Sequence, residues 1–321
     1  MKVFVIGGGA AGMMAAITSA KYGNDVTLVE KTSDVGNKIK ITGKGRCNLT
    51  FFGDVDDFKK NIVKNYKFMY SSFNNFSNND VINYFEEIGV KTKVERGNRV
   101  FPVSDNAIDV VSALKKELKK YNVKVIYNTK LNDLIVKDGV LDGIVLSNGK
   151  VEKCDKCIIA TGGTSYKNTG SSGDFYAVAK KVGHNIIDIL PGLVPLRSND
   201  DICKKLQGLS LKNIEFKLQY EDGTIIYQDF GEMLFAHFGI TGPVVLSSSS
   251  KLNREKDIKE KLKRKSVKAI IDLKPALSEE TLDKRICRDF EKYCNKEFKN
   301  ALNDLLPQKL IPVIIQISGI D

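Results

Sequence analysis

A glycine-rich loop set between a short apolar run and a helix-like segment constrains this chain more than any other feature. The run Val3–Ile6 is followed by the loop Gly7–Gly12 (Gly-Gly-Gly-Ala-Ala-Gly), and a second apolar run, Val26–Val29, ends on Glu30. Unbroken apolar runs of this length are typical of parallel strands that are buried on both faces. The order of strand, loop, helix, strand and acid predicts a dinucleotide-binding βαβ unit.

The individual residues of this unit suit a dinucleotide for different physical reasons. Gly7 suits the tight turn, Gly9 lets the backbone approach a pyrophosphate, and Gly12 lets the helix pack close to the strand. The free N–H groups at the start of the helix favour phosphate binding. Glu30 can bind ribose hydroxyls and disfavours a 2′-phosphate, so FAD or NAD fits this site better than NADP.

The length of 321 residues is compatible with two domains, and a hydrophobic content of 42% and a charged content of 28% are ordinary for a globular protein. The net charge of +11 is one mark of a nucleic-acid-binding protein. We attribute it instead to solvated lysines, because the densest basic stretch, residues 251–268, also carries acidic residues and has no aromatic residue for base stacking. We therefore expect no nucleic-acid partner.

The sequence shows neither a signal peptide nor an apolar stretch long enough to span a bilayer. The six cysteines are scattered, which agrees with a reducing compartment. We expect a cytoplasmic protein without a membrane partner. Cys154 and Cys157 match a Cys-x-x-Cys pair, but Cys157 begins an apolar run, and no second Cys/His pair stands at a useful spacing. We predict no metal site and no redox pair there.

The pattern along the chain predicts an α/β fold with two domains. Residues 1–192 form the first, with a helix over Asp105–Tyr121, a β-meander over residues 131–153 and a strand over Cys157–Ala160. Residues 193–321 form the second, β-rich over 193–273 and helical over 275–321, because Pro191-Gly192 and Pro195 mark a boundary.

Local patterns also predict which side chains are buried. Residues 36–48 are expected to form a loop, and residues 55–89 short helices. Ser104 or Asp105 is expected to cap the helix that follows, and Ser278 a later one. The residues expected in the core are Phe58, Phe68, Tyr70, Phe73, Tyr84, Phe85, Ile108, Val111, Leu114, Leu118, Leu282, Ile286, Cys287, Phe290, Cys294 and Phe298.

Five segments together resemble the BaiN/RdsA family of bacterial FAD-dependent oxidoreductases, also called the aminoacetone-oxidase family. They are Val5–Gly12, Lys40–Thr50, Val94–Pro102, Ala160–Gly163 and Gly231–Pro243. The first and fourth are shared by many flavoproteins, whereas the other three are far more specific. The resemblance runs from Met1 to Asp321. It implies a Rossmann-like FAD-binding domain (a parallel sheet with helices and a β-meander) and an inserted β-rich and helical substrate-side domain. Because members usually continue with a segment that returns to the FAD domain, we expect this sequence to be truncated before that segment.

The resemblance also implies which residues hold the cofactor. The glycine loop would cradle the pyrophosphate, the end of the second strand the adenosine ribose, and residues 43–48 the flavin or its phosphates. Leu131 would offer its backbone to adenine, and residues 161–163 would end the sheet against the cofactor. The cofactor-binding residues expected are Gly7, Gly9, Ala11, Gly12, Glu30, Lys31, Gly43, Gly45, Arg46, Asn48, Leu131, Thr161, Gly162 and Gly163.

Two residues have competing interpretations. His237 lies in a glycine-flanked loop and is the candidate catalytic residue, as a proton relay; the alternative is a histidine buried in a turn. Cys47 follows Arg46, which can lower the pKa of its thiol; the alternative is a small residue packed beside the cofactor.

These observations together predict an FAD-dependent oxidoreductase that transfers hydride to or from a small organic substrate, with NAD(P)H as the reductant that the resemblance implies. Both reduction of an unsaturated ring or enone and amine oxidation fit. Three alternatives stay open: an inactive fragment that binds part of FAD, an NAD-linked dehydrogenase, and, more weakly, a flavoprotein acting on RNA. The sequence does not define an oligomeric state.

Overall fold

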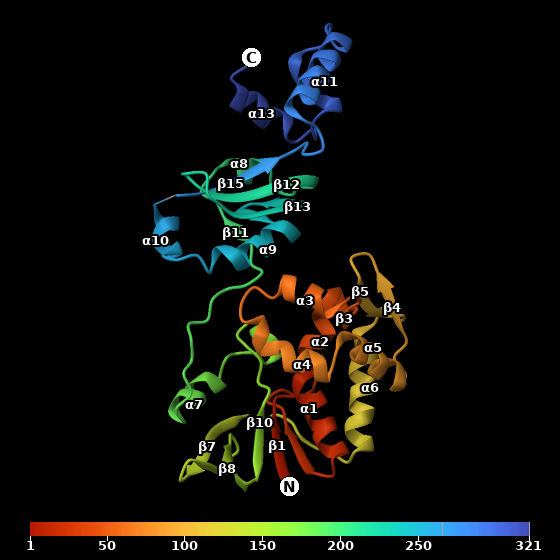
Figure 1. The fold of residues 1–321 in the computed structure, drawn as a ribbon, viewed down its shortest axis with the longest axis vertical. Coiled ribbons are helices and arrows are strands. Elements are labelled where there is room, and N and C mark those ends of the chain that lie inside the picture. Colours follow the sequence, from red (N-terminus) through yellow and green to blue (C-terminus); the bar gives the residue numbers. More distant parts are fainter. Residues whose placement is uncertain (265, 321) are drawn as a thin grey trace. The chain divides into compact units, whose positions relative to one another are not determined.

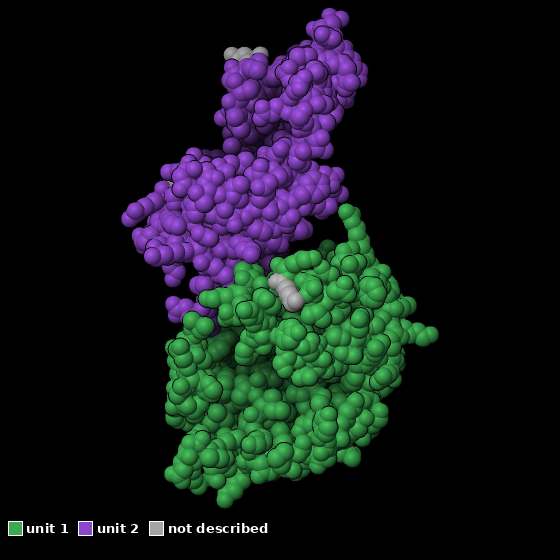
Figure 2. All heavy atoms as spheres, in the orientation of Figure 1, with its two compact units in different colours: residues 1–187 green, residues 188–321 purple. Residues whose placement is uncertain are grey.

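The computed structural model describes residues 1–264 and 266–320. The chain divides into two compact units, residues 1–187 and residues 188–321 (Figure 2). Sequence patterns had placed this boundary after residue 192. Each unit has a hydrophobic core of its own.

A four-stranded parallel sheet forms the centre of unit 1, with the strand order β10-β1-β2-β6 (Figure 1). Its strands are β1 (Lys2–Ile6), β2 (Asp25–Val29), β6 (Lys124–Ile126) and β10 (Lys156–Ile159). Side chains alternate across this sheet: Val3 and Val5 pack with the helices, whereas Phe4 and Ile6 pack with the β-meander. Both faces are therefore covered, which explains the unbroken apolar runs.

The two covering layers differ in kind (Figure 1). Helices α1 (Ala10–Lys21), α5 (Asn78–Glu87) and α6 (Ala107–Lys120) share one core with the sheet, and the meander β7 (Leu131–Lys137), β8 (Val140–Leu146) and β9 (Val151–Lys153) shares the other. The predicted Rossmann-like architecture is thus confirmed. The remaining elements of unit 1 are α2 (Asn37–Ile41), η1 (Thr42–Gly45), β3 (Thr50–Phe51), α3 (Val55–Asn61), η2 (Tyr66–Met69), α4 (Tyr70–Asn75), β4 (Thr92–Glu95), β5 (Arg99–Pro102), η3 (Lys167–Thr169) and α7 (Phe175–Lys181).

Unit 2 is built on a five-stranded antiparallel sheet with the order β11-β14-β13-β12-β15. The strands are β11 (Leu196–Arg197), β12 (Ser210–Tyr220), β13 (Ile225–Ala236), β14 (Gly239–Thr241) and β15 (Val267–Asp272). The helices are α8 (Ile202–Lys205), α9 (Pro243–Leu252), α10 (Ile258–Lys263), α11 (Glu279–Lys292), α12 (Phe298–Ala301), η4 (Leu302–Asp304) and α13 (Ile311–Ser318). Phe216 is fully buried in the core of this unit. Within the described residues, no helix combines the length and the apolar character that a bilayer crossing requires.

Several local predictions are wrong. Residues 36–48 contain the short helices α2 and η1 rather than only a loop. Helix α6 is capped by Asn106, whose side chain accepts a hydrogen bond of 3.0 Å from the N–H of Ile108, and not by Ser104 or Asp105. Ile108 itself is 58% exposed, because the buried stripe of this helix begins at Ala107 and continues at Val110.

Some predicted core positions also lie at the surface. Phe68 and Tyr70 are 85% and 55% exposed, because the short helices η2 and α4 lie at the surface and contain no buried residue. On α11, Phe290 is exposed on the helix and packs its ring against Phe298, with 5.6 Å between the ring centroids. Cys287 and Cys294 are exposed as well. The predicted cap of α11 is present, since the Ser278 hydroxyl accepts from the N–H of Thr281.

Candidate functional site

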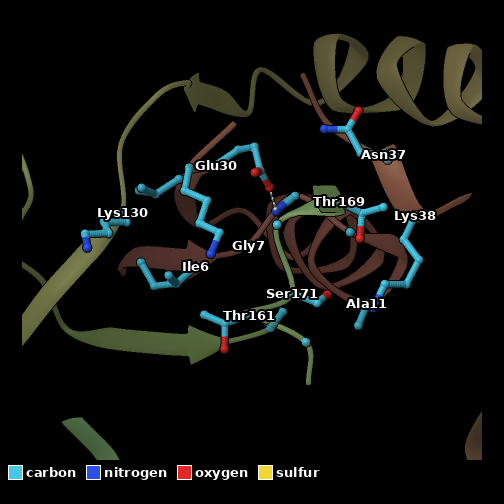
Figure 3. A pocket seen from close by; sticks show the side chains of 18 of the residues that line it. Ile6, Gly7, Ala11, Glu30, Asn37, Lys38, Lys130, Thr161, Thr169 and Ser171 are labelled. Carbon is cyan, nitrogen blue, oxygen red and sulfur yellow. Dashed lines mark hydrogen bonds between the residues drawn. The ribbon is translucent and has the colours of Figure 1, made fainter. Parts of the chain in front are cut away.

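A pocket of about 310 Å³ lies at the carboxyl ends of β1, β2 and β10 in unit 1 (Figure 3). From β1 the chain adds β2 and β6 on one side of the sheet and later adds β10 on the other side. The strand order therefore reverses direction at β1. Open α/β sheets bind ligands at such a reversal, outside the carboxyl ends of the strands. The pocket is lined by the glycine loop, by residues that follow β2 and β10, and by the start of β7.

Three of the four glycines of the loop differ in what surrounds them. Gly7 has a φ of +104°, and a Cβ added to it would lie 2.4 Å from the carbonyl oxygen of Ala160. A Cβ at Gly12 would lie 1.7 Å from the carbonyl oxygen of Gly7, so this glycine lets α1 pack against β1. A Cβ at Gly9 would meet nothing within 4 Å. Gly9 therefore borders open pocket space rather than packed protein.

The amino terminus of α1 opens on this pocket. Gly9 is its N-cap and provides no side-chain cap, and the first turn contains no acidic residue. Helix geometry leaves the first N–H groups of α1 without intrahelical partners. Since Ala10 and Ala11 line the pocket, these donors and the positive end of the helix dipole suit an anionic group.

Glu30 is a buried carboxylate at the end of β2, with 7% of its surface exposed. Its Oε2 accepts a hydrogen bond of 2.6 Å from the N–H of Gly8 (dashed in Figure 3), and its Oε1 accepts from the N–H and the hydroxyl of Thr32 at 2.8 and 2.7 Å. Oε2 has a single protein partner among these bonds, so it retains the capacity to accept from a ligand hydroxyl. The residue both holds the glycine loop and faces the pocket.

Lys31 contacts the segment that follows β10. Its Nζ donates to Asp174 Oδ2 at 2.7 Å and also to the hydroxyl of Ser172, which itself donates to Asp174 Oδ1 at 2.7 Å. The hydrogen bonds from Lys31 and Ser172 lower the pKa of Asp174. The sequence resemblance had assigned Lys31 to the adenosine ribose, whereas its ammonium group here ties two chain segments together.

Other pocket residues were not predicted. The polar residues among them include Asn37, Lys38, Thr129, Lys130, Thr169, Gly170, Ser171, Ser172 and Asp174. A signal for Thr169, Gly170, Ser171 and Ser172 was present, because residues 165–173 are polar and rich in glycine and serine and come shortly after the apolar run of β10.

Among the predicted cofactor residues, the structure places Gly7, Gly9, Ala11, Glu30, Lys31, Leu131, Thr161 and Gly162 around the pocket. Gly12 does not line the pocket and packs against the backbone of Gly7. Gly43, Gly45, Arg46, Asn48 and Gly163 are not among the lining residues. Contacts of all these residues with a cofactor stay predictions.

Arg46 takes part in a cluster of charges beside the β4–β5 hairpin. Its Nη1 lies 2.9 Å from Glu95 Oε1 and 3.3 Å from Asp105 Oδ1, and its guanidinium carbon lies 4.0 Å from the centre of the Phe101 ring. Asp105 is also paired with Lys93, at 2.5 Å. These contacts hold the guanidinium group of Arg46 in a defined position.

The cysteines of unit 1, of which Cys47 and Cys154 are buried and Cys157 is half-buried, are packed residues rather than activated thiols. Burial raises the pKa of Cys47, so the alternative in which Arg46 lowers it is not supported. Burial likewise raises the pKa of Cys154, and it raises that of Cys157 to about 12. Within residues 1–264 and 266–320, no group of three or more His, Cys, Asp or Glu side chains gathers in a way that could hold a metal ion.

His237 belongs to unit 2, in the turn between β13 and β14. Its side chain is exposed, and its ring packs edge-on against that of Phe238 with 5.0 Å between centroids. The alternative of a histidine buried in a turn is therefore wrong. The catalytic role of His237 stays a prediction.

A parallel sheet with a glycine loop, a free helix terminus and a buried acid at one ligand-binding edge defines the class of dinucleotide-binding proteins with a Rossmann-like domain. Residues 1–250 match the HI0933-like protein Rossmann domain, and residues 190–321 match the HI0933-like protein barrel and H2TH domain. The chain belongs to the HI0933-like family. The family resemblance inferred from the sequence is thereby confirmed.

Several relatives match nearly the whole chain. The 3-dehydro-bile acid delta(4,6)-reductase of Clostridium scindens is 28% identical over 330 residues, covering 99% of this chain and 76% of the relative. The ribosomal RNA dihydrouridine synthase of Escherichia coli is 28% identical over 318 residues, covering 98% of this chain and 74% of the relative. Among solved structures, the open conformation of a flavocytochrome c3 fumarate reductase is similar with a TM-score of 0.44 and 18% identity; the match covers 66% of this chain and 47% of that one.

Proposed function

We propose that unit 1 binds FAD and that the protein uses it to transfer hydride to or from a small organic substrate. The observation that carries this proposal is the cradle at Gly9, where an uncapped helix terminus borders open space beside the buried acid Glu30. A pyrophosphate fits the first feature and an unphosphorylated ribose fits the second. When bound, FAD supplies the group that accepts and donates hydride.

The residues of the chain would bind and orient the cofactor. Backbone N–H groups at Ala10 and Ala11 would donate to the pyrophosphate, and Oε2 of Glu30 would accept from a ribose hydroxyl. The ammonium groups of Lys38 and Lys130, both at the pocket, add positive charge. Lys38 is already positioned by a hydrogen bond of 2.9 Å from its Nζ to the carbonyl oxygen of Ser165.

For the substrate, we propose an unsaturated ring or enone, with NAD(P)H as the reductant. The relative from Clostridium scindens, named as a bile acid reductase, supports this choice over amine oxidation. The test is anaerobic mixing of the FAD-loaded protein with NADH or NADPH, followed by addition of a steroid enone. We expect loss of the flavin's visible absorbance and its return upon addition of the enone. A flavin that neither nucleotide reduces would contradict the proposed reductant.

A second candidate, action on RNA, is favoured by one surface segment. Tyr66, Phe68 and Tyr70 expose their rings beside the exposed Lys64 and Lys67. Exposed rings between cations can stack on bases, at ~1–3 kcal/mol per base. The relative from Escherichia coli, named as a ribosomal RNA dihydrouridine synthase, agrees with this candidate.

Salt dependence separates the two candidates. If RNA is the substrate, binding of a ribosomal RNA fragment should weaken steeply with added salt and should weaken further in Phe68→Ala. A small-molecule substrate remains our first proposal, and it predicts no specific RNA binding in either protein.

A further inference from the structure

The order of the central strands places the glycine loop between two segments that nevertheless touch each other. Strand β1 lies between β10 and β2. The residues that follow β2 begin with Glu30 and Lys31, and those that follow β10 run on to Asp174. Because Lys31 Nζ lies 2.7 Å from Asp174 Oδ2, the two flanking segments are joined at the edge of the sheet where β1 ends.

Further contacts connect the segment 165–174 to residues that follow β2. A Cβ added to Gly170 would lie 3.5 Å from Lys31 Cε and 3.8 Å from Glu30 Oε1, so the backbone passes close to both residues. Lys38 Nζ donates to the carbonyl oxygen of Ser165 at 2.9 Å. The segment is thus attached near both of its ends, and its residues from Thr169 to Ser172 line the pocket (Figure 3).

The ion pair between Lys31 and Asp174 can break and re-form easily. The side chains of Lys31 and Asp174 are 27% and 43% exposed, and ion pairs that are open to water contribute little free energy. Such a pair can open without unfolding the unit. Its opening would loosen the end of the segment at Asp174, whereas the bond from Lys38 to Ser165 would remain.

We propose that the Lys31–Asp174 pair is a latch that holds segment 165–174 over the dinucleotide site and limits the rate at which the cofactor leaves. Lys31 is then a positioning residue rather than a ligand of the ribose. This inference rests on the proposed function, since it assigns the latch to the FAD site.

The first test uses the protein without any cofactor. Hydrogen exchange is compared between the parent chain, Lys31→Met, Asp174→Asn and the control Lys181→Met, which breaks a lysine–aspartate pair with Asp133 away from the pocket lining. We expect amides of residues 165–174 to exchange faster in the first two variants and at the parental rate in the control. Equal exchange in all four proteins would overturn the latch.

The second test measures release of FAD, after dilution into an excess of competing apoprotein, by the recovery of flavin fluorescence. We expect release to be about two- to fivefold faster in Lys31→Met and in Asp174→Asn. Release should be no faster in the double variant than in Lys31→Met, because that variant already lacks both the pair with Asp174 and the hydrogen bond to Ser172. Parental release rates in folded variants, as judged by circular dichroism, would refute the role in cofactor retention.

The two readouts separate the latch from the proposed function. If the parent chain binds no FAD, the proposed function fails, together with the role in retention. The exchange measurement contains no ligand, so it still decides whether the Lys31–Asp174 pair holds the segment in place.

Discussion

The substitution Gly9→Val tests the cofactor cradle because it should remove binding while leaving the fold intact. Gly9 has a φ of −77°, which valine adopts readily, and a Cβ added there would meet nothing within 4 Å. The expected loss of stability is limited to the change of N-cap residue, about 1 kcal/mol. The valine side chain would occupy the space where a pyrophosphate approaches the backbone.

The expected loss of affinity is much larger than the loss of stability. Displacing the pyrophosphate forfeits at least two hydrogen bonds to a charged group, each about 1.5 kcal/mol, so FAD affinity should fall by about 100-fold or more. Quenching of flavin fluorescence on titration measures the affinity, and urea unfolding measures the stability. Gly12→Ala is the matched contrast, since its Cβ would lie 1.7 Å from the carbonyl oxygen of Gly7 and should destabilise the fold itself. Parental affinity in a folded Gly9→Val protein would refute our placement of the pyrophosphate.

Three further predictions address separate parts of the chain. His237→Ala should lower turnover, by about 100-fold if the imidazole relays a proton, while the flavin content stays parental; unchanged steady-state turnover would remove His237 from the mechanism. For Asp34, burial alone would raise the pKa, but hydrogen bonds from Lys115 and Lys40 outweigh it and lower the pKa from 3.8 to about 2. Because the folded-state pKa is the lower one, the stabilisation is present above about pH 4 and is lost as the pH falls toward 2. Urea unfolding should show Asp34→Asn to be less stable than the parent by up to about 1 kcal/mol at neutral pH, and this difference should vanish near pH 2; a constant difference would contradict the assignment. Finally, Phe216→Ala, at a fully buried position of unit 2, should lower the free energy of unfolding by about 3–5 kcal/mol; a loss below about 1 kcal/mol in calorimetry or urea unfolding would show that this core is poorly packed.

The first βαβ unit and the meander could be predicted from sequence because their signals are local. Unbroken apolar runs, three glycines at fixed spacing and one acid at a strand end lie within thirty residues of each other, and each has a direct structural cause. The structure gives that cause for Gly7 and Gly12 as close backbone contacts. The same holds for the meander, whose strands are separated by short turns.

The role of Lys31 could not be predicted, because its partner Asp174 lies 143 residues away in the sequence. Only the strand order brings the two together. Helix α9 was missed for another reason: Ser248 and Ser249 are fully buried, with their hydroxyls donating to the carbonyl oxygens of Val245 and Leu246. Buried serines interrupt the apolar pattern from which a helix is normally inferred.

The most direct test of the central claim is the visible absorption spectrum of the purified 321-residue chain, together with identification of any cofactor released on denaturation. We predict a flavin spectrum, acquired during expression or on addition of FAD, and release of intact FAD. A protein that remains colourless after addition of FAD would contradict the account, and binding of NAD by that protein would favour an NAD-linked dehydrogenase.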